Sequence, residues 1–205
     1  MRKIQLTPAK YPSIKHYLKA FIDPDFDLEQ DLPFRTVVQT IPANTVITHI
    51  GDVENFAHYI ISGYARVSAF DRNAEEKVLE FFGPDDFISA YTSFVYRTPS
   101  KVFVKTISEC TFETIHVDDI NTAIRQNLNI ALLTLNAVHK NYAAKTQIQL
   151  DFLLLDNDEL VAKILHEREE LLNITSAKLI ASYLDMTEVT FSRIRKDLRD
   201  NLDNL

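Results

Sequence analysis

Residues 173–198, NITSAKLIASYLDMTEVTFSRIRKDL, contain two short amphipathic segments with a brief interruption between them. Thr175 or Ser176 can cap the first as a helix and Thr187 the second, because a side-chain hydroxyl accepts a hydrogen bond from a free N–H group at a helix start. The connection Leu184–Met186 has the length of a helix-turn-helix turn. Its central aspartate stands where such turns usually have glycine, and aspartate tolerates left-handed backbone better than most residues. The segment therefore predicts a helix-turn-helix.

The second helix of this pair has one apolar and one polar face. Phe191, Ile194 and Leu198 are spaced i, i+3, i+7 and predict the buried side. The opposite face carries the candidate DNA-binding residues Glu188, Val189, Ser192, Arg193, Lys196 and Arg199. Arginine can bind guanine O6 and N7 in the major groove, and both cations can neutralise phosphates. This face predicts binding to double-stranded DNA, and the alternative is a solvated charged helix in an unrelated bundle.

Upstream, residues 128–153 contain neither proline nor glycine and predict one helix of about 26 residues, about 39 Å long. One of its apolar faces carries the candidate dimerisation residues Leu128, Leu132, Leu135 and Tyr142, and the opposite face carries Ile130, Leu133, Ala137, Ala144 and Ile148. A helix that is apolar on two sides must bury both. We expect one face to cover the chain's own domain and the other to contact a second copy in a two-fold homodimer. A core helix buried within a single chain is the alternative.

The segment between Val37 and about Val117 is rich in β-branched and aromatic residues in short runs separated by turn residues. The chain's three glycines, Gly51, Gly63 and Gly83, all stand at the ends of these runs. Glycine is common where the chain turns sharply, because it adopts positive φ at little cost. The pattern predicts a small antiparallel barrel or sandwich. A short helical lead-in within residues 1–35 and a short helix over 118–127 are expected on either side.

Composition limits the possible classes of protein. A chain of 205 residues, 46% of them apolar, can form one ordinary domain and a smaller second one. No apolar run approaches the ~18 residues of a membrane span, and no signal peptide is visible, so no membrane partner is expected. The single cysteine, Cys110, excludes an intramolecular disulfide, and we expect a reducing, cytoplasmic compartment. The net charge of −7 argues against indiscriminate binding to polyanions.

Four segments in a fixed order resemble the Crp/Fnr family of transcription regulators. They are IPANTVITHIGD with YIISGYARV (41–52 and 59–67), FFGPDDFISAYTSF (81–94), FLLLDNDELVAKIL (152–165) and IASYLDMTEVTFSRIRKDL (180–198). The resemblance implies an α+β fold: a double-stranded β-helix (jelly-roll) sensor barrel, a long dimerisation helix and a C-terminal helix-turn-helix domain. The implied boundaries are 1–127 for the cyclic-nucleotide-binding-like sensor, 128–157 for the dimerisation helix and hinge, and 158–205 for the DNA-binding domain. RNA polymerase is a further candidate partner of such a regulator.

The chain departs from the family's patterns in three places. The family reads DNA through positions that fall here on Glu188, Val189 and Arg193, and only Arg193 keeps the usual residue type, so the operator should differ. The residues after the recognition helix, DNLDNL (200–205), suggest that the β-hairpin wing of many relatives is reduced or absent. The third departure is in the ligand cassette.

In cyclic-AMP binders of this family a glutamate contacts the ribose and an arginine the cyclic phosphate. Ala90 and Ser100 stand at those positions here, and Ser89 replaces the cassette glycine. A buried phosphate without a paired cation is costly, so cyclic AMP is not the expected effector. Arg97 and Lys101 could bind another anion or could be exposed loop charges. These five residues are the candidate pocket for an unknown small-molecule effector.

Other chemistry finds little support. The histidines form neither an HxH nor an HExxH pattern, and the sequence contains no GxSxG motif and no phosphate-binding loop. No catalytic residue, metal or cofactor is therefore expected. Two alternatives to a DNA-binding regulator remain: a sensor or interaction module whose helix-turn-helix no longer binds DNA, and a cupin-type metalloenzyme using His49, His58 and Glu54.

Overall fold

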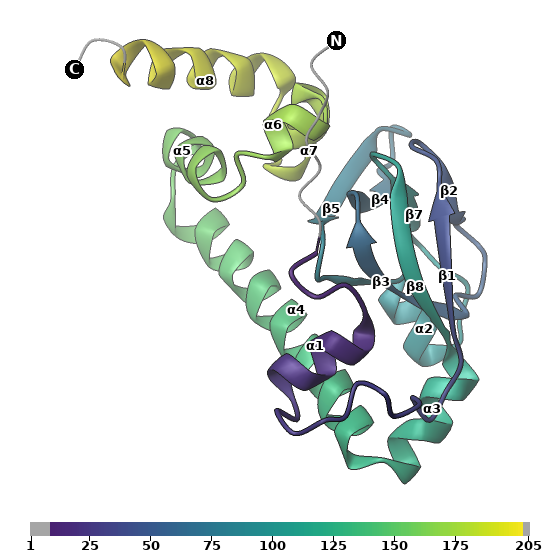
Figure 1. The fold of residues 1–205 in the computed structure, drawn as a ribbon. Coiled ribbons are helices and arrows are strands. Elements are labelled where there is room, and N and C mark those ends of the chain that lie inside the picture. Colours follow the sequence, from purple (N-terminus) through teal and green to yellow (C-terminus); the bar gives the residue numbers. More distant parts are fainter. Residues whose placement is uncertain (1–8, 203–205) are drawn as a thin grey trace.

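The computed structural model describes residues 9–202, which form eight strands and eight helices (Figure 1). The strands are β1 (Thr36–Ile41), β2 (Val46–Thr48), β3 (Phe56–Ser62), β4 (Ala65–Phe70), β5 (Glu76–Phe82), β6 (Phe87–Ile88), β7 (Phe103–Thr106) and β8 (Cys110–His116). The helices are α1 (Ile14–Phe21), α2 (Tyr91–Tyr96), α3 (Val117–Gln126), α4 (Leu128–Leu154), α5 (Asn157–Glu167), α6 (Leu171–Ile174), α7 (Ala177–Tyr183) and α8 (Glu188–Leu202).

The strands form two four-stranded antiparallel sheets, ordered β1-β8-β3-β6 and β2-β7-β4-β5. Apolar side chains that include Ile60, Val104 and Phe112 fill the space between them. Gly63 joins β3 to β4 at φ +92, and a Cβ there would lie 2.2 Å from the Glu109 carbonyl oxygen, so the turn requires glycine. The expected jelly-roll barrel is confirmed.

Helix α4 is the long helix that the sequence predicts, and it ends one residue later than expected. Asn127 caps it through hydrogen bonds from the N–H groups of Asn129 and Ile130 to its side-chain oxygen. Ile130 and Leu133 are buried in a core shared with α1 and α3. The opposite side of α4 lies open, and Figure 1 shows the helix running from α3 away from the barrel toward α5.

The C-terminal helices begin with a capping box, in which Asp156 accepts a hydrogen bond from the Glu159 N–H and the Glu159 side chain accepts one from the Asp156 N–H. Residues 158–172 are amphipathic at helical spacing and would suit a single helix, but α5 ends at Glu167. Arg168 leaves the helical region at φ −135 and ψ 43, and α6 then begins at Leu171, whose side chain is buried. The break between α5 and α6 therefore allows the Leu171 side chain to pack in the core of the C-terminal helices.

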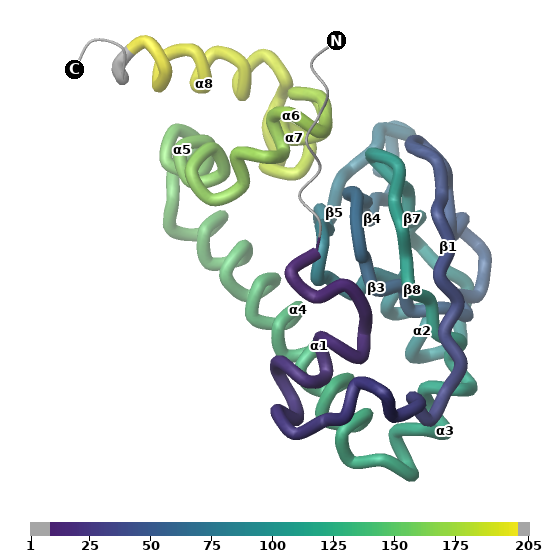
Figure 2. The backbone as a smooth tube through the Cα atoms, in the orientation of Figure 1, coloured from purple at the N-terminus to yellow at the C-terminus, as the bar shows by residue number. Residues whose placement is uncertain are grey.

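Helix α7 lies directly on β5, an edge strand of the second sheet (Figure 2). Val78 and Phe81 of β5 are buried in one apolar cluster with side chains of α5, α6, α7 and α8. The Ser182 hydroxyl accepts a hydrogen bond from the Val78 N–H at 3.0 Å and donates one to the Glu76 carbonyl oxygen at 2.9 Å. The helix-turn-helix thus shares its core with the second sheet and satisfies backbone groups at the sheet's edge.

Two expectations concern the chain ends. The predicted lead-in contains a single helix, α1, and residues 1–8 lie outside the described part of the chain. Residues 200–202 of the segment expected to replace the wing continue α8, and 203–205 lie outside the described residues. No helix between residues 9 and 202 is long and apolar enough to cross a membrane.

We predict that Ser182→Ala loosens α7 from β5. Both hydrogen bonds to the strand edge are lost, which costs about 1–2 kcal/mol of the free energy of unfolding. Amide hydrogen exchange at Val78 should accelerate, as measured by NMR. Ser192→Ala, which alters a hydroxyl on α8 away from this contact, is the control. Unchanged exchange at Val78 in Ser182→Ala would show that the hydroxyl does not hold the strand edge.

Candidate functional site

The helix-turn-helix has the local chemistry that the sequence predicts. The Ser176 hydroxyl caps α7 by accepting a hydrogen bond from the Leu179 N–H, and the Thr187 hydroxyl accepts one from the Thr190 N–H at 3.1 Å. Asp185 adopts φ 51, the left-handed conformation expected in the turn. The connection spans 184–187, one residue more than expected, because Thr187 lies outside α8 as its cap.

The two faces of α8 also lie as expected. Phe191 and Ile194 are buried in the cluster shared with α5 and α7, and Leu198 packs against it. The cap at its N-terminus and this buried side fix the orientation of the helix. The remaining side of α8 therefore faces away from the rest of the chain, and Figure 1 shows α8 at the outer end of the molecule.

The outer side of α8 brings the six candidate DNA-binding residues onto one surface. Five of them are exposed and Ser192 is half-buried; the exposed ones are Glu188, Val189, Arg193, Lys196 and Arg199. Among the side chains that the structure describes, no carboxylate pairs with any of the three cations. Val189 is 79% exposed and belongs to none of the apolar clusters formed by the described residues.

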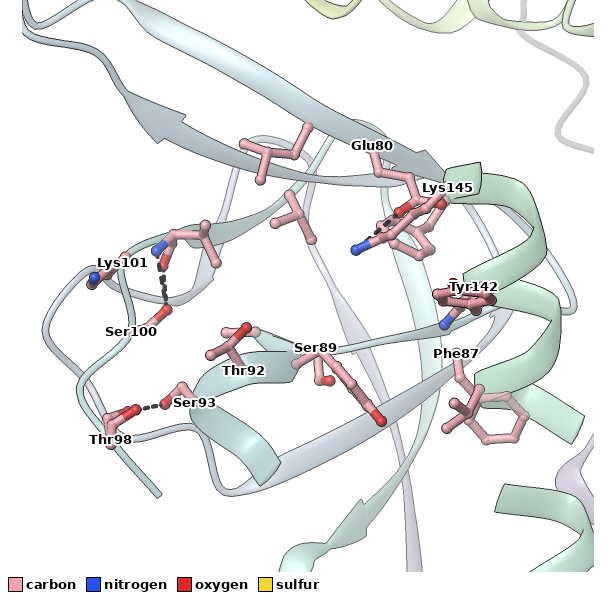
Figure 3. A pocket seen from close by; sticks show the side chains of 18 of the residues that line it. Glu80, Phe87, Ser89, Thr92, Ser93, Thr98, Ser100, Lys101, Tyr142 and Lys145 are labelled. Carbon is pink, nitrogen blue, oxygen red and sulfur yellow. Dashed lines mark hydrogen bonds and ion pairs between the residues drawn. The ribbon is translucent and has the colours of Figure 1, made fainter. Parts of the chain in front are cut away.

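A second candidate site is a cavity of about 350 Å³ between the barrel and α4 (Figure 3). Its walls come from β4, β5, the segment 87–102 and the middle of α4. The apolar lining includes Leu79, Phe82, Phe87, Val102 and Val138, and the charged lining consists of Glu80, Lys101 and Lys145. A volume near the lower end of the usual range for ligand pockets suits a small molecule.

Four of the five candidate effector residues line this cavity: Ser89, Ala90, Ser100 and Lys101. Arg97 does not, because its guanidinium donates hydrogen bonds to the Glu54 carbonyl oxygen and the Asn55 side chain. Tyr142, expected at a dimer contact, lines the cavity from α4 while remaining largely exposed. The cavity and the open side of α4 therefore adjoin each other.

Glu54 holds the floor of the cavity in place. Its buried carboxylate accepts hydrogen bonds from the Thr48 hydroxyl at 2.5 Å, the Phe56 N–H at 3.0 Å and the Ala90 N–H at 3.3 Å. The Ser93 hydroxyl accepts a hydrogen bond from the Glu54 N–H at 2.9 Å. These bonds tie the loop before β3 to the start of α2. Glu54 thus has a structural role and is not free to bind a ligand.

The carboxylate of Glu80, unlike that of Glu54, is buried with few partners. It is 9% exposed, and within residues 9–202 its carboxylate accepts no hydrogen bond. Its single ion pair is with Lys145 of α4, at 3.8 Å between Oε2 and Nζ. Burial raises the pKa of Glu80 to about 7, and the charges of Lys145 and Arg168 offset this only in part. The cavity therefore contains one desolvated carboxyl group with an incomplete set of partners.

Sequence reasoning missed Glu80, Asn141 and Lys145 as cavity residues. Glu80 could have been noticed as a lone carboxylate inside the apolar strand KVLEFF (77–82). Nothing in the sequence near Asn141 and Lys145 of α4 indicates that they line a cavity. Their position beside the barrel depends on where the long helix lies. Only the fold brings them beside Ser89 and Ser100.

His49 and His58, the histidines considered for a metal site, do not form a group of metal ligands. His58 is buried, its Nδ1 lies 2.9 Å from the Thr114 hydroxyl, and burial lowers its pKa. His49 is exposed. Between residues 9 and 202 no three His, Cys, Asp or Glu side chains are grouped as metal ligands. The cupin-type alternative therefore has no site among the described residues.

One protein family and several solved structures are similar to this chain. Residues 38–127 match the cyclic nucleotide-binding domain family. No curated protein matches the chain. Similar solved structures include the c-di-GMP responsive global regulator CLP of Xanthomonas campestris, with 18% identity, 81% of this chain and 87% of that chain covered, and a TM-score of 0.65.

Two further structures share the fold over most of their length. FixK2 of Bradyrhizobium japonicum has 14% identity and a TM-score of 0.71, with 82% of this chain and 86% of that chain covered. A putative Crp/Fnr family transcriptional regulator of Eubacterium rectale has 14% identity and a TM-score of 0.66, with 90% and 83% covered.

The state of Glu80 predicts a pH dependence of stability that one substitution removes. A carboxyl group whose pKa is raised on folding binds its proton more tightly in the folded state, so stability falls as pH rises from about 4.5 to about 7. Above pH 7 the full cost applies, on the order of 3 kcal/mol. Glu80→Gln should therefore be more stable than the parent at pH 8 and nearly equal to it at pH 5, in urea unfolding. Glu75→Gln, on the same hairpin but exposed, is the control; an equal response of both variants would contradict the assignment.

Proposed function

Residues 38–127 match the cyclic nucleotide-binding domain family, and the chain has the fold of the Crp/Fnr regulators. From this premise we propose that it is a homodimeric, sequence-specific DNA-binding transcription regulator controlled by an effector in the barrel cavity. The observation that supports this most strongly is the outer side of α8. A capped helix in a helix-turn-helix presents three cations that pair with no carboxylate among the described residues, and this side makes no competing contact with the rest of the described chain. Such a surface suits the major groove.

The pairing of two copies is supported by the open side of α4. Leu128 and Leu135 are exposed, and the apolar residues continue to Leu153, which is 80% exposed. Leu128, Leu132, Leu135 and Tyr142 follow one another at spacings of four, three and seven residues, as along a coiled-coil seam. A monomer seldom leaves so much apolar surface in water. A second copy of α4 related by a two-fold axis would cover it, and the two recognition helices would then address half-sites about 34 Å apart.

Control by the barrel is supported by the elements that line the cavity. An effector there would contact α4 through Asn141, Tyr142 and Lys145 and the sheet through Leu79 and Glu80. The same α4 leads to the hinge at 155–156, and the same strand β5 contacts α7. A shift at either contact would reorient α8 relative to its copy. The departures at Ala90 and Ser100 argue against cyclic AMP as that effector.

We predict that the purified protein selects a limited set of fragments from genomic DNA and that Arg193→Ala binds them about 10- to 100-fold more weakly. The loss follows because an exposed arginine on the recognition helix makes a bidentate contact with a base or a contact with phosphate. Binding is measured by electrophoretic mobility shift across a salt series. Arg125→Ala is the matched control, since Arg125 is exposed at the end of α3, far from α8 (Figure 1). A protein that retains no fragment at low salt would instead be a sensor module without DNA binding.

We further predict that Val189 contacts the 5-methyl group of a thymine. Val189 is exposed one helical turn before Arg193, and a valine side chain gains by covering a methyl group in the major groove. Replacing the contacted thymine by uracil should weaken binding about fourfold. This is the affinity change that corresponds to the free energy of burying one methyl group. Val189→Ala should bind the thymine and uracil sites with nearly equal affinity. Uracil substitutions without effect at every thymine of a selected site would contradict the contact.

A further inference from the structure

The cassette end of the cavity offers little to an anion. The Ser100 hydroxyl donates a hydrogen bond to the Val102 carbonyl oxygen at 2.7 Å and accepts one from the Val102 N–H at 3.2 Å. The Ser93 hydroxyl donates to the Thr98 carbonyl oxygen at 2.5 Å. The side chains nearest to where a phosphate would lie are thus occupied by their own backbone, and Arg97 is bonded elsewhere.

The two lysines of the lining are also weak anchors for an anion. Lys101 is exposed, and the Lys145 side chain is 59% exposed, so both ammonium groups keep most of their water. Ion pairs made by such solvated groups contribute little to binding, because water competes with them. Figure 3 shows Lys101 beside Ser100 and Lys145 on the opposite, α4 side of the cavity, so the two do not converge on one point.

Glu80, by contrast, offers the cavity a site for a positively charged group. Its carboxylate lies beside the apolar side chains of Leu79 and Phe82, with no hydrogen bond from residues 9–202 and one long ion pair to a solvated lysine. A donor that reaches a buried, under-bonded carboxylate forms a stronger hydrogen bond than an exposed pair does. A positive charge on that donor adds to the gain, because it neutralises a charge that the cavity has desolvated.

We propose that the cavity binds a small molecule with an apolar body and a protonated amine, and that the ammonium group of this molecule binds the Glu80 carboxylate. The charge preference of the cavity is then the reverse of that of a cyclic nucleotide site. The apolar body lies against Leu79, Phe82, Phe87 and Val102, and the ammonium displaces Lys145 from the carboxylate. This inference rests on the proposed function only in naming the cavity as the effector site.

Three commercially available probes with one shared body test the charge preference: 2-phenylethylamine, 2-phenylethanol and 3-phenylpropionate. Their binding to the full chain without DNA is measured by isothermal calorimetry at pH 7.5. The amine is expected to bind at least about tenfold more tightly than the alcohol or the acid, as one charged hydrogen bond at a buried site implies. Cyclic AMP is expected to show no binding in the same range.

Two variants, with a third as control, assign the preference to its residues. Glu80→Gln should abolish the advantage of the amine, and Glu75→Gln should leave it intact. Lys145→Met should strengthen amine binding, because a competitor for the carboxylate is removed; if Lys145 instead held an anionic ligand, the same variant would weaken binding of the acid. The charges of Lys145, Asp86 and Arg168 act on Glu80, and Tyr183 also lies within its electrostatic reach. None of the proposed variants alters Asp86, Arg168 or Tyr183, and none introduces a new charge.

Proton release is a further readout, which a purely structural role of Glu80 would not produce. A bound ammonium stabilises the ionised carboxyl, so amine binding near pH 7 should release protons, seen as an enthalpy that changes with the ionisation heat of the buffer. The proposal is overturned if the acid or the alcohol binds as tightly as the amine, if the preference survives Glu80→Gln, or if no probe binds up to 10 mM. Because DNA is absent, these results stand apart from whether the chain binds DNA.

Discussion

The contact between α7 and the edge of β5 is the constraint on which the arrangement of the molecule depends. Ser182 satisfies backbone groups of the strand, and Val78 and Phe81 enter the core of the C-terminal helices. The register between β4 and β5 shifts by one residue at Leu79. A bulge of this kind changes which way neighbouring side chains point. Leu79 and Glu80 can therefore line the cavity while Val78 and Phe81 serve the helices.

This arrangement gives the cavity two physical routes to α8. One runs through α4, whose residues Asn141, Tyr142 and Lys145 line the cavity and whose end leads through residues 155–156 to α5. The other runs through β5 directly to α7. The ion pair between Glu80 and Lys145 connects the two routes across the cavity. A ligand that breaks this pair would act on both elements at once, so the effector's chemistry and the position of the recognition helix are linked in the proposed mechanism.

Much of this could be predicted from the sequence because it depends on local patterns. Caps at Ser176 and Thr187, the left-handed Asp185 and the spacing of Phe191 and Ile194 define the helix-turn-helix without reference to the rest of the chain. The strands between Val37 and Val117 follow from their alternation and turns. The long helix follows from the lack of glycine and proline between Leu128 and Leu153.

The remaining features depend on contacts between distant segments. Glu80 and Lys145 are 65 positions apart, and nothing in either neighbourhood indicates their meeting at the cavity. Arg97 is close to the cassette in sequence, but hydrogen bonds to Glu54 and Asn55 turn it away from the cavity. The break after Glu167 follows from the need to bury Leu171, which local helix propensity does not express. Sequence patterns thus locate the exposed side of α8 better than they locate the cavity.

The most direct test of the central claim is hydroxyl-radical footprinting of the protein on a fragment that it has selected. We expect two protected stretches related by two-fold symmetry, with centres about one helical turn apart, and loss of both in the Arg193→Ala protein. A single protected stretch would contradict the pairing of two copies through α4. Protection that persists unchanged in Arg193→Ala would contradict the assignment of the outer side of α8 as the surface that binds DNA.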